Sequence, residues 1–298
     1  MTKYSHKLTH LKVSAHLLVA LLCFAGTSFL KANAETKTII HSQTQSDPKE
    51  ALILKILKLA VAKSGTKYSY EEYAEPITEA RMLNLVRDGN MSIMWAGTQI
   101  KYEEEMYPIR IPVLKGLLGH RVFIIRKGDQ FLFDNVKTFS DFQKIPLGQG
   151  RFWGDTAVLK NAGMNVIDPV KYASIFYMLE GGRFDYFPRA IHEPWSEIAQ
   201  RRELNLTVEE NLLLIYPLAM YFFVSRDNMS LARDIERGFR LAIEDGSYDE
   251  MFFSHPMIKE ALENANLKER TIYRLANPNL NPKTPIDDKS LWLNIDDL

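Results

Sequence analysis

The chain alternates strand-like and helix-like segments in two successive series, and the break between the series limits the folds open to it. In the first series, apolar and turn residues predict strands at 38–41, 68–73 and 91–95, with helices at 48–64 and 79–87 between them. This alternation is typical of a sheet whose strands are joined by crossover helices. The break covers 109–119, where Pro112, Gly116 and Gly119 disfavour the interior of a helix or strand.

A second series follows the break, and the chain then returns to the first. Residues 121–126 (RVFIIR) predict a buried strand, and 172–179 carry an apolar helical stripe that ends at Gly181. We therefore predict an α/β, two-lobed fold of the type II periplasmic-binding-protein kind, each lobe a mostly parallel sheet flanked by helices. Lobe 1 would hold residues 35–116 and 220–298, and lobe 2 residues 117–219. The paired crossings, near 113–120 and 216–222, would form a two-segment hinge that lets the lobes close over a ligand. The proline-rich tail from Asn277 predicts an extended surface strap.

The first 34 residues have the pattern of a secretory signal. Lys3, Lys7 and Lys12 precede an apolar run over 17–30, and Ala32-Asn33-Ala34 matches a cleavage site before Glu35. The apolar run is too short for a typical membrane-spanning helix. We expect export to the periplasm, with cleavage after Ala34.

Composition excludes several classes of function. The chain carries 37 basic and 37 acidic residues, and four of the lysines lie in the signal, so the mature chain would have an acidic excess. This balance gives no reason to expect binding to nucleic acid or to an anionic membrane. The single cysteine, Cys23, also lies in the signal, so a mature protein has neither a thiol nucleophile nor a thiolate metal site.

Four short motifs, in their order and spacing, resemble one protein family. They are DGNMSIMWAGT (88–98), GQGRFWGDT (148–156), GGRFDYFPR (181–189) and IEDGSYDEMF (243–252). Together they resemble the bacterial periplasmic solute-binding proteins of extracellular family 3, which bind polar amino acids for ABC importers. Within that family the chain looks similar to a transporter-like branch that shares GQG-x-x-W-x-D and GRFDYFPR. The resemblance covers residues from about 36 to about 260.

The resemblance implies a function, and two departures from the family pattern bear on the ligand. In the amino-acid binders a threonine followed closely by arginine grips the ligand carboxylate, but here Thr98 is followed by Gln99-Ile100-Lys101-Tyr102-Glu103. The acid that holds the ligand ammonium is also missing beyond Asp185, and the next one is Glu193. We expect a monomeric protein without a cofactor that closes around a small polar, carboxylate-bearing solute. Its partner would be an ABC permease or a membrane sensor.

Most candidate ligand-binding residues fall at the ends of predicted strands and at the glycine-rich loop. Arg81 lies one turn into the predicted helix at 79–87, where it can point into the cleft or into solvent. Arg189 ends a strand and can bind a carboxylate with two nitrogens, or it can form a buried ion pair with Asp185 or Glu193. The loop before the helix at 155 offers free backbone amides to an anion, although Asp155 can equally cap its own helix. The predicted site residues are Arg189, Thr98, Arg81, Gly150, Trp153, Asp155, Thr156, Trp95 and Glu193.

Two other functions stay open at this point. His192-Glu193 is the one adjacent pair that resembles acid–base machinery, so an exported dehydratase- or lyase-like enzyme on the same scaffold is the alternative. A purely structural protein with a vestigial cleft is a third interpretation. We expect neither catalytic residues nor a metal site, because the four histidines after the signal lack metal-ligand spacing and no serine lies in a G-x-S-x-G turn.

Overall fold

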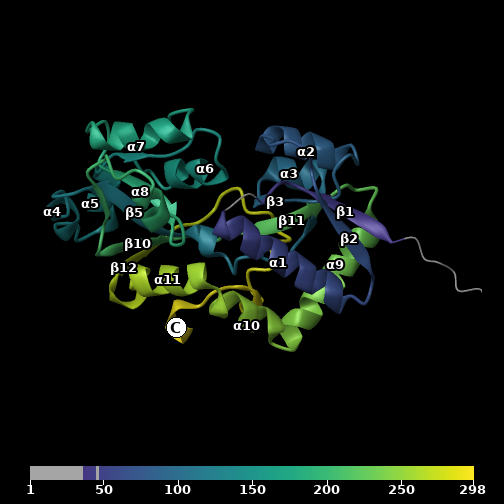
Figure 1. Cartoon of the computed structure of the whole chain (residues 1–298). Helices are drawn as coiled ribbons and strands as arrows, with labels where there is room; N and C mark the ends of the chain where they lie inside the picture. Colours follow the sequence, from purple (N-terminus) through teal and green to yellow (C-terminus); the bar gives the residue numbers. More distant parts are fainter. Residues whose placement is uncertain (1–35, 45–46) are drawn as a thin grey trace, which may run out of the picture. The chain divides into compact units, whose positions relative to one another are not determined.

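In the computed structural model, which describes residues 36–44 and 47–298, the first series of elements closely follows the predicted one. Asp47 caps the first helix by accepting from the Lys49 amide, and Pro48 occupies its first position. Figure 1 shows this helix, α1, beside α9 (Met229–Glu244). The elements are β1 (Lys37–His41), α1 (Pro48–Lys63), β2 (Tyr68–Glu72), α2 (Glu79–Arg87), β3 (Met94–Gly97), α3 (Ile100–Glu105) and β4 (Tyr107–Ile109).

The second series starts at a short turn of 3-10 helix, η1 (Leu117–Gly119), and ends where the chain returns. It contains β5 (His120–Arg126), α4 (Phe131–Asp134), α5 (Phe139–Lys144), β6 (Leu147–Gly148), α6 (Gly154–Asn161), β7 (Val166–Ile167), α7 (Tyr172–Glu180), β8 (Tyr186–Ala190), α8 (Pro194–Ala199), β9 (Leu206–Val208) and β10 (Leu212–Ile215). The return adds β11 (Met220–Val224), α9 (Met229–Glu244), α10 (Ser247–Ser254), α11 (Pro256–Ala265), η2 (Leu267–Glu269), β12 (Thr271–Arg274), η3 (Lys289–Leu291) and η4 (Ile295–Asp297).

The strands of the described residues form three sheets, one parallel, one antiparallel and one mixed. β1 and β2 pair in parallel, and β3, β11 and β4 form a three-stranded sheet in which β11 is antiparallel to both neighbours. The large sheet has the order β12-β10-β5-β8-β6-β7, with β9 beside β5. The expectation of mostly parallel sheets is met only in part, because β5 is antiparallel to β8, β9 and β10. β5 directly follows the first crossing and β11 the return, and both are antiparallel to the neighbours they pair with.

The large sheet is buried on both faces, as its apolar strands require. Along β5, Phe123 and Ile125 face a core formed with α5 and α6, whereas Ile124 faces a core under α7. This alternation follows from the two-residue period of a strand. The alternation therefore determines on which face of the large sheet each β5 side chain lies.

The C-terminal part of the chain contacts elements of both series, since α9 packs on α1 while β12 joins the large sheet. The sequence assigned residues 220–298 to lobe 1, but β12 pairs in parallel with β10 at the edge of the large sheet. The tail is also more than a surface strap, because Leu291 and Ile295 are buried and Trp292 packs on Gly116. These apolar side chains, spaced among prolines, bind the tail to the core. The lobes themselves stay a prediction, since residues Lys37–Leu298 form one compact unit.

The predicted signal, residues 1–34, lies outside the described residues. Among the helices of the described ranges, none combines the length and apolar character needed to cross a membrane.

Candidate functional site

A cavity of about 1140 Å³ lies between elements of the first series and the large sheet. From the first series, the start of α1 and the loop after β3 line the cavity. From the second series it is lined by the start of β5, the end of β8 and the starts of α6 and α8. α11 closes one side. Five of the predicted site residues line this large cavity: Thr98, Trp153, Asp155, Arg189 and Glu193.

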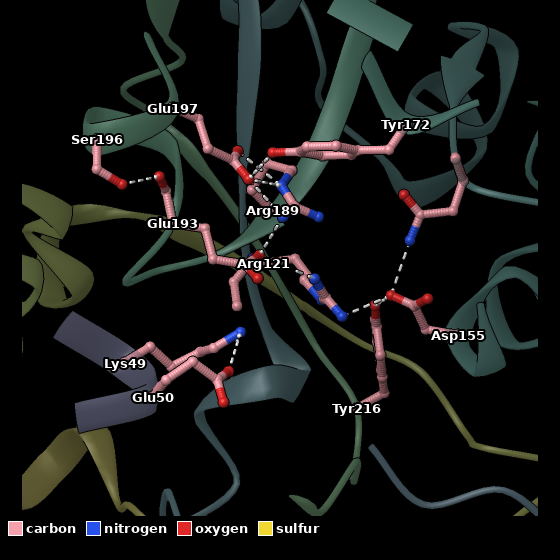
Figure 2. A network of polar contacts seen from close by, with 12 residues as sticks. Lys49, Glu50, Arg121, Asp155, Tyr172, Arg189, Glu193, Ser196, Glu197 and Tyr216 are labelled. Atoms are coloured by element: carbon pink, nitrogen blue, oxygen red, sulfur yellow. Dashed lines mark hydrogen bonds and ion pairs between the residues drawn. The ribbon is translucent and has the colours of Figure 1, made fainter. Parts of the chain in front are cut away.

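Arg189 lies at the end of β8 and is held by two carboxylates rather than left free. Its Nε and Nη2 donate to the two oxygens of Glu197 at 2.8 and 2.6 Å, and Nη2 lies 3.0 Å from Glu193 Oε2 (Figure 2). Burial alone would lower the pKa of Arg189, but Glu193 and Glu197 outweigh it and raise that pKa. The predicted alternative of a buried ion pair therefore holds for Glu193. Asp185, the other suggested partner, pairs instead with Arg126 at 2.6 Å.

A second arginine, which the sequence analysis missed, lies beside the first. Arg121 Nη2 is 2.6 Å from Asp155 Oδ2, and its Nη1 is 3.7 Å from Glu193 Oε2. The same Asp155 oxygen accepts from Gln149 at 2.8 Å and from the Tyr216 hydroxyl at 3.0 Å. Asp155 thus joins a buried network instead of capping α6, whose first turn receives no side-chain cap.

Glu193 lies between the two arginines and faces the first series. Burial alone would raise its pKa, but Arg189, His192, Arg121 and Lys49 outweigh burial and lower the pKa to about 2. Lys49, at the start of α1, pairs with Glu50 at 3.2 Å and points toward Glu193 in Figure 2. Burial would lower the pKa of Lys49, but Glu50, Glu193 and Asp47 raise it. The positive charge of Lys49 and the negative charge of Glu193 therefore stabilise each other across the cavity.

His192 and Glu193 make different contacts and are not hydrogen-bonded to each other in the described residues. The Glu193 carboxylate accepts from the Ala190 amide at 2.8 Å and contacts the arginines, while both ring nitrogens of His192 lack a hydrogen-bond partner among the described residues. Burial, chiefly, lowers the pKa of His192 to about 4, so its ring is neutral at pH 7. Among the described residues, no group of three or more His, Cys, Asp or Glu side chains is placed to hold a metal ion.

Thr98 lines the large cavity, but its hydroxyl is already engaged. Thr98 Oγ1 donates to Glu103 Oε1 at 2.6 Å, and Glu103 also accepts from Arg110. The sequence analysis noted that no arginine follows Thr98 closely. The charged residue that contacts Thr98 is instead Glu103, a buried carboxylate.

Four predicted residues lie outside the large cavity and contact the protein itself. Arg81 is exposed on α2 and lies 3.7 Å from Glu75, and the Trp95 indole donates to Glu50 at 2.6 Å. A Cβ added to Gly150 would come within 2.6 Å of the Trp153 ring, so this glycine makes room for the tryptophan. Thr156 Oγ1 donates to the Gly150 carbonyl at 2.6 Å and lines a second cavity of about 410 Å³.

The residues that sequence reasoning missed are charged or aromatic partners of the predicted ones. Arg121 opens an otherwise apolar strand, a position that signals a side chain leaving the sheet core. Glu197 lies eight residues after Arg189 on a separate helix, and Tyr172 starts α7, so neither spacing indicates their contact. The missed residues are Lys49, Arg121, Tyr172, Glu197 and Tyr216.

The comparisons with known proteins identify the fold. No family model and no curated protein sequence matches the chain. Among solved structures, a probable amino-acid ABC transporter extracellular-binding protein, ytmK of Bacillus subtilis, is 13% identical, with 76% of this chain and 100% of that chain covered and a TM-score of 0.56. A putative ABC transporter binding component of Wolinella succinogenes, complexed with lysine, is 14% identical, with coverages of 76% and 98% and a TM-score of 0.53.

A third similar structure is a Salmonella typhimurium periplasmic binding protein with high arginine specificity. It is 14% identical, with 73% of this chain and 97% of that chain covered and a TM-score of 0.50. All three are described as binding proteins, and at such identities the likeness establishes the fold. The predicted α/β periplasmic-binding-protein fold is confirmed, and with it, at the level of fold, the resemblance that the motifs indicated.

Proposed function

We propose that this protein is an exported solute-binding protein that closes its two lobes around a small polar solute bearing a carboxylate. The observation that carries the proposal is the cavity of about 1140 Å³ between the two series of elements, lined by buried charges on one side and by Lys49 on the other. Small-molecule sites are concave, few per protein, and oriented by a few polar groups. The binding proteins of the same fold support this role.

The polar groups that remain available suggest how a carboxylate would bind. Arg189 uses Nε and Nη2 for its carboxylate partners, and its second terminal nitrogen carries no dashed line in Figure 2. This Nη1 and the Lys49 amine are donors that a solute acceptor could reach from the cavity. Of the predicted site residues, the proposal keeps the five that line the cavity: Thr98, Trp153, Asp155, Arg189 and Glu193.

A single solute donor group would find acceptors in the same place. Asp155 and Glu193 present carboxylate oxygens beside the arginines, so a hydroxyl or amine of the solute can be oriented against them. The three carboxylates of the network, Asp155, Glu193 and Glu197, already offset the two arginines. For this reason a solute with one carboxylate and further polar groups fits better than one with several negative charges. Delivery to an ABC permease or to a membrane sensor is part of the proposal.

The test is native mass spectrometry of protein purified without refolding, followed by thermal-shift measurements with the solute so identified. Binding to the folded state alone raises the melting temperature. We expect this rise to vanish in Arg189→Gln and to persist in Arg240→Gln, whose exposed side chain pairs with Glu236 on α9. A wild-type protein that retains no solute and responds to none in a broad metabolite screen would contradict the proposal.

A further inference from the structure

The surroundings of Arg189 are those of a bound guanidinium ion. Glu197 accepts from it in the side-on, two-bond manner, with Nε to Oε2 at 2.8 Å and Nη2 to Oε1 at 2.6 Å. Glu193 adds a contact of 3.0 Å to the same Nη2. A planar guanidinium and a carboxylate form this paired arrangement with higher specificity than an ammonium can.

Aromatic rings complete the enclosure. The guanidinium carbon lies 4.9 Å from the ring centroid of Phe187, 5.1 Å from that of Trp153 and 5.7 Å from that of Tyr172. At these distances the ring faces attract a cation. Arg189 is only 6% exposed, so the cation and its partners are largely removed from water.

The walls of this enclosure are held by contacts that do not involve Arg189. The Tyr172 hydroxyl donates to Glu197 at 2.6 Å, and Glu193 accepts from the Ala190 amide at 2.8 Å. Trp153 and Phe187 stack with an angle of 19° between their planes. These contacts remain when the Arg189 side chain is removed.

We propose that Glu193, Glu197, Trp153, Tyr172 and Phe187 form a guanidinium-binding subsite that the chain fills with its own Arg189. All but Phe187 line the large cavity, so the subsite opens toward the place where the solute would bind. That this subsite lies in a ligand-binding cleft rests on the proposed function. Its ability to bind a guanidinium ion does not rest on that function. Arg189 is then a specificity-determining residue, since it replaces a ligand cation with a tethered one.

The filled subsite changes which solute group is accepted. An empty enclosure of two carboxylates and three rings selects a cation. With Arg189 in place, the cavity instead meets the remaining nitrogen of the guanidinium, which can only donate. Solutes that carry a guanidinium or amine at this end are excluded, and solutes with an acceptor there are favoured.

The experiment empties the subsite and offers it a free guanidinium. Arg189→Ala is titrated with methylguanidinium and with L-arginine by calorimetry and thermal shift, beside wild type. Because paired hydrogen bonds and ring contacts are both restored, we expect the variant to bind methylguanidinium at least about tenfold more tightly than wild type. Methylurea, which has a similar shape without the charge, should not bind, and methylammonium should bind more weakly because it lacks the planar fork.

The matched control is Arg189→Ala combined with Glu197→Gln. This change keeps the shape of the subsite and removes the paired carboxylate, so methylguanidinium binding should be lost. Equal binding of methylguanidinium to wild type and to Arg189→Ala, or undiminished binding to the double variant, would overturn the proposal.

The proposal also predicts the outcome if Arg189→Ala does not fold in buffer alone. Refolding in millimolar methylguanidinium should then restore a cooperative melting transition, and refolding in methylurea should not. Failure of both additives would contradict the inference. None of these measurements uses the natural solute, so a failure here is distinguishable from a wild type that binds no metabolite.

Discussion

Gly119 lies directly against the backbone of Tyr216. The Tyr216 amide donates to the Gly119 carbonyl at 3.0 Å, and a Cβ added to Gly119 would lie 1.8 Å from the Tyr216 carbonyl oxygen. The segment that leaves the first series and the segment that returns to it are thus in backbone contact. A side chain at this position would force the two crossings apart.

Gly119→Ala should therefore destabilise the protein strongly. Its methyl group meets backbone, which cannot rotate away as a side chain can, and overpacking of this kind costs about 3 kcal/mol. Urea denaturation measures the free energy of unfolding. Gly97→Ala is the control, since its Cβ would make only an ordinary contact of 3.5 Å with Leu118. Equal stability of the two variants would show that the crossings can separate freely.

Thr98 and Glu103 should be energetically coupled. Thr98→Val removes the donor of a 2.6 Å bond to a buried carboxylate, and such charge-assisted bonds contribute roughly 1.5–3 kcal/mol. A double-mutant cycle with Thr98→Val and Glu103→Gln, read by urea denaturation, measures the coupling free energy. We expect a coupling of about 1 kcal/mol or more. Additive effects would show that Thr98 does not depend on Glu103.

Stability should fall on mild acidification because two buried histidines resist protonation. Burial, chiefly, lowers the pKa of His120 and of His192 from 6.5 to about 4. Between these values the unfolded chain binds protons that the folded chain does not, so this stability is present above pH 6.5 and is lost as the pH falls toward 4. The lowered pKa of Glu193 acts in a lower window, from its ordinary 4.5 down to about 2.

Urea denaturation at a series of pH values from 7.5 to 5 tests this prediction. Replacing both histidines by glutamine should flatten the dependence of the unfolding free energy on pH in this range. An unchanged slope in the double variant would place the titrating groups elsewhere.

Trp292, in the C-terminal tail, should stabilise the segment 112–119, where the chain leaves the first series. Its ring packs on Gly116, its indole donates to the Pro285 carbonyl at 2.8 Å, and the following Leu293 amide donates to the Lys115 carbonyl at 2.8 Å. Trp292→Ala should cost roughly 3 kcal/mol and speed amide exchange at 112–119. Ile286→Ala, half-exposed in the same tail, is the control and should leave both unchanged.

Local signals in the sequence predicted the elements well. The predicted helix at 48–64 matches α1, and the predicted strand at 121–126 matches β5 to within one residue. The alternation of apolar strands and helices was sufficient for the α/β class, because a strand without polar positions must be covered on both faces. β12 was missed because it is short and partly exposed, and its partner strand β10 lies over 50 residues earlier.

The sequence predicted some charged residues of the site but not the residues that they contact. Arg189 and Glu193 stand out at a strand end, but which carboxylate an arginine meets depends on the fold. Glu197 reaches Arg189 from α8, and Arg121 reaches Asp155 from β5, contacts that no local spacing encodes. Arg81 was included for its place in a helix beside the cleft and Trp95 as an aromatic ring that can stack on a ligand. In the structure Arg81 lies on the surface beside Glu75, and Trp95 is buried and donates to Glu50.

The edge strand β12 has a consequence for the order of folding. It covers β10 at one edge of the large sheet, and the tail that follows it packs on the segment 112–119. Neither contact can form before residues 271–292 have been synthesised. A nascent chain in which these residues are still inside the ribosome therefore leaves β10 unpaired on that side and Gly116 without its Trp292 contact. Until then the exposed edge of β10 can bind other polypeptides, including chaperones.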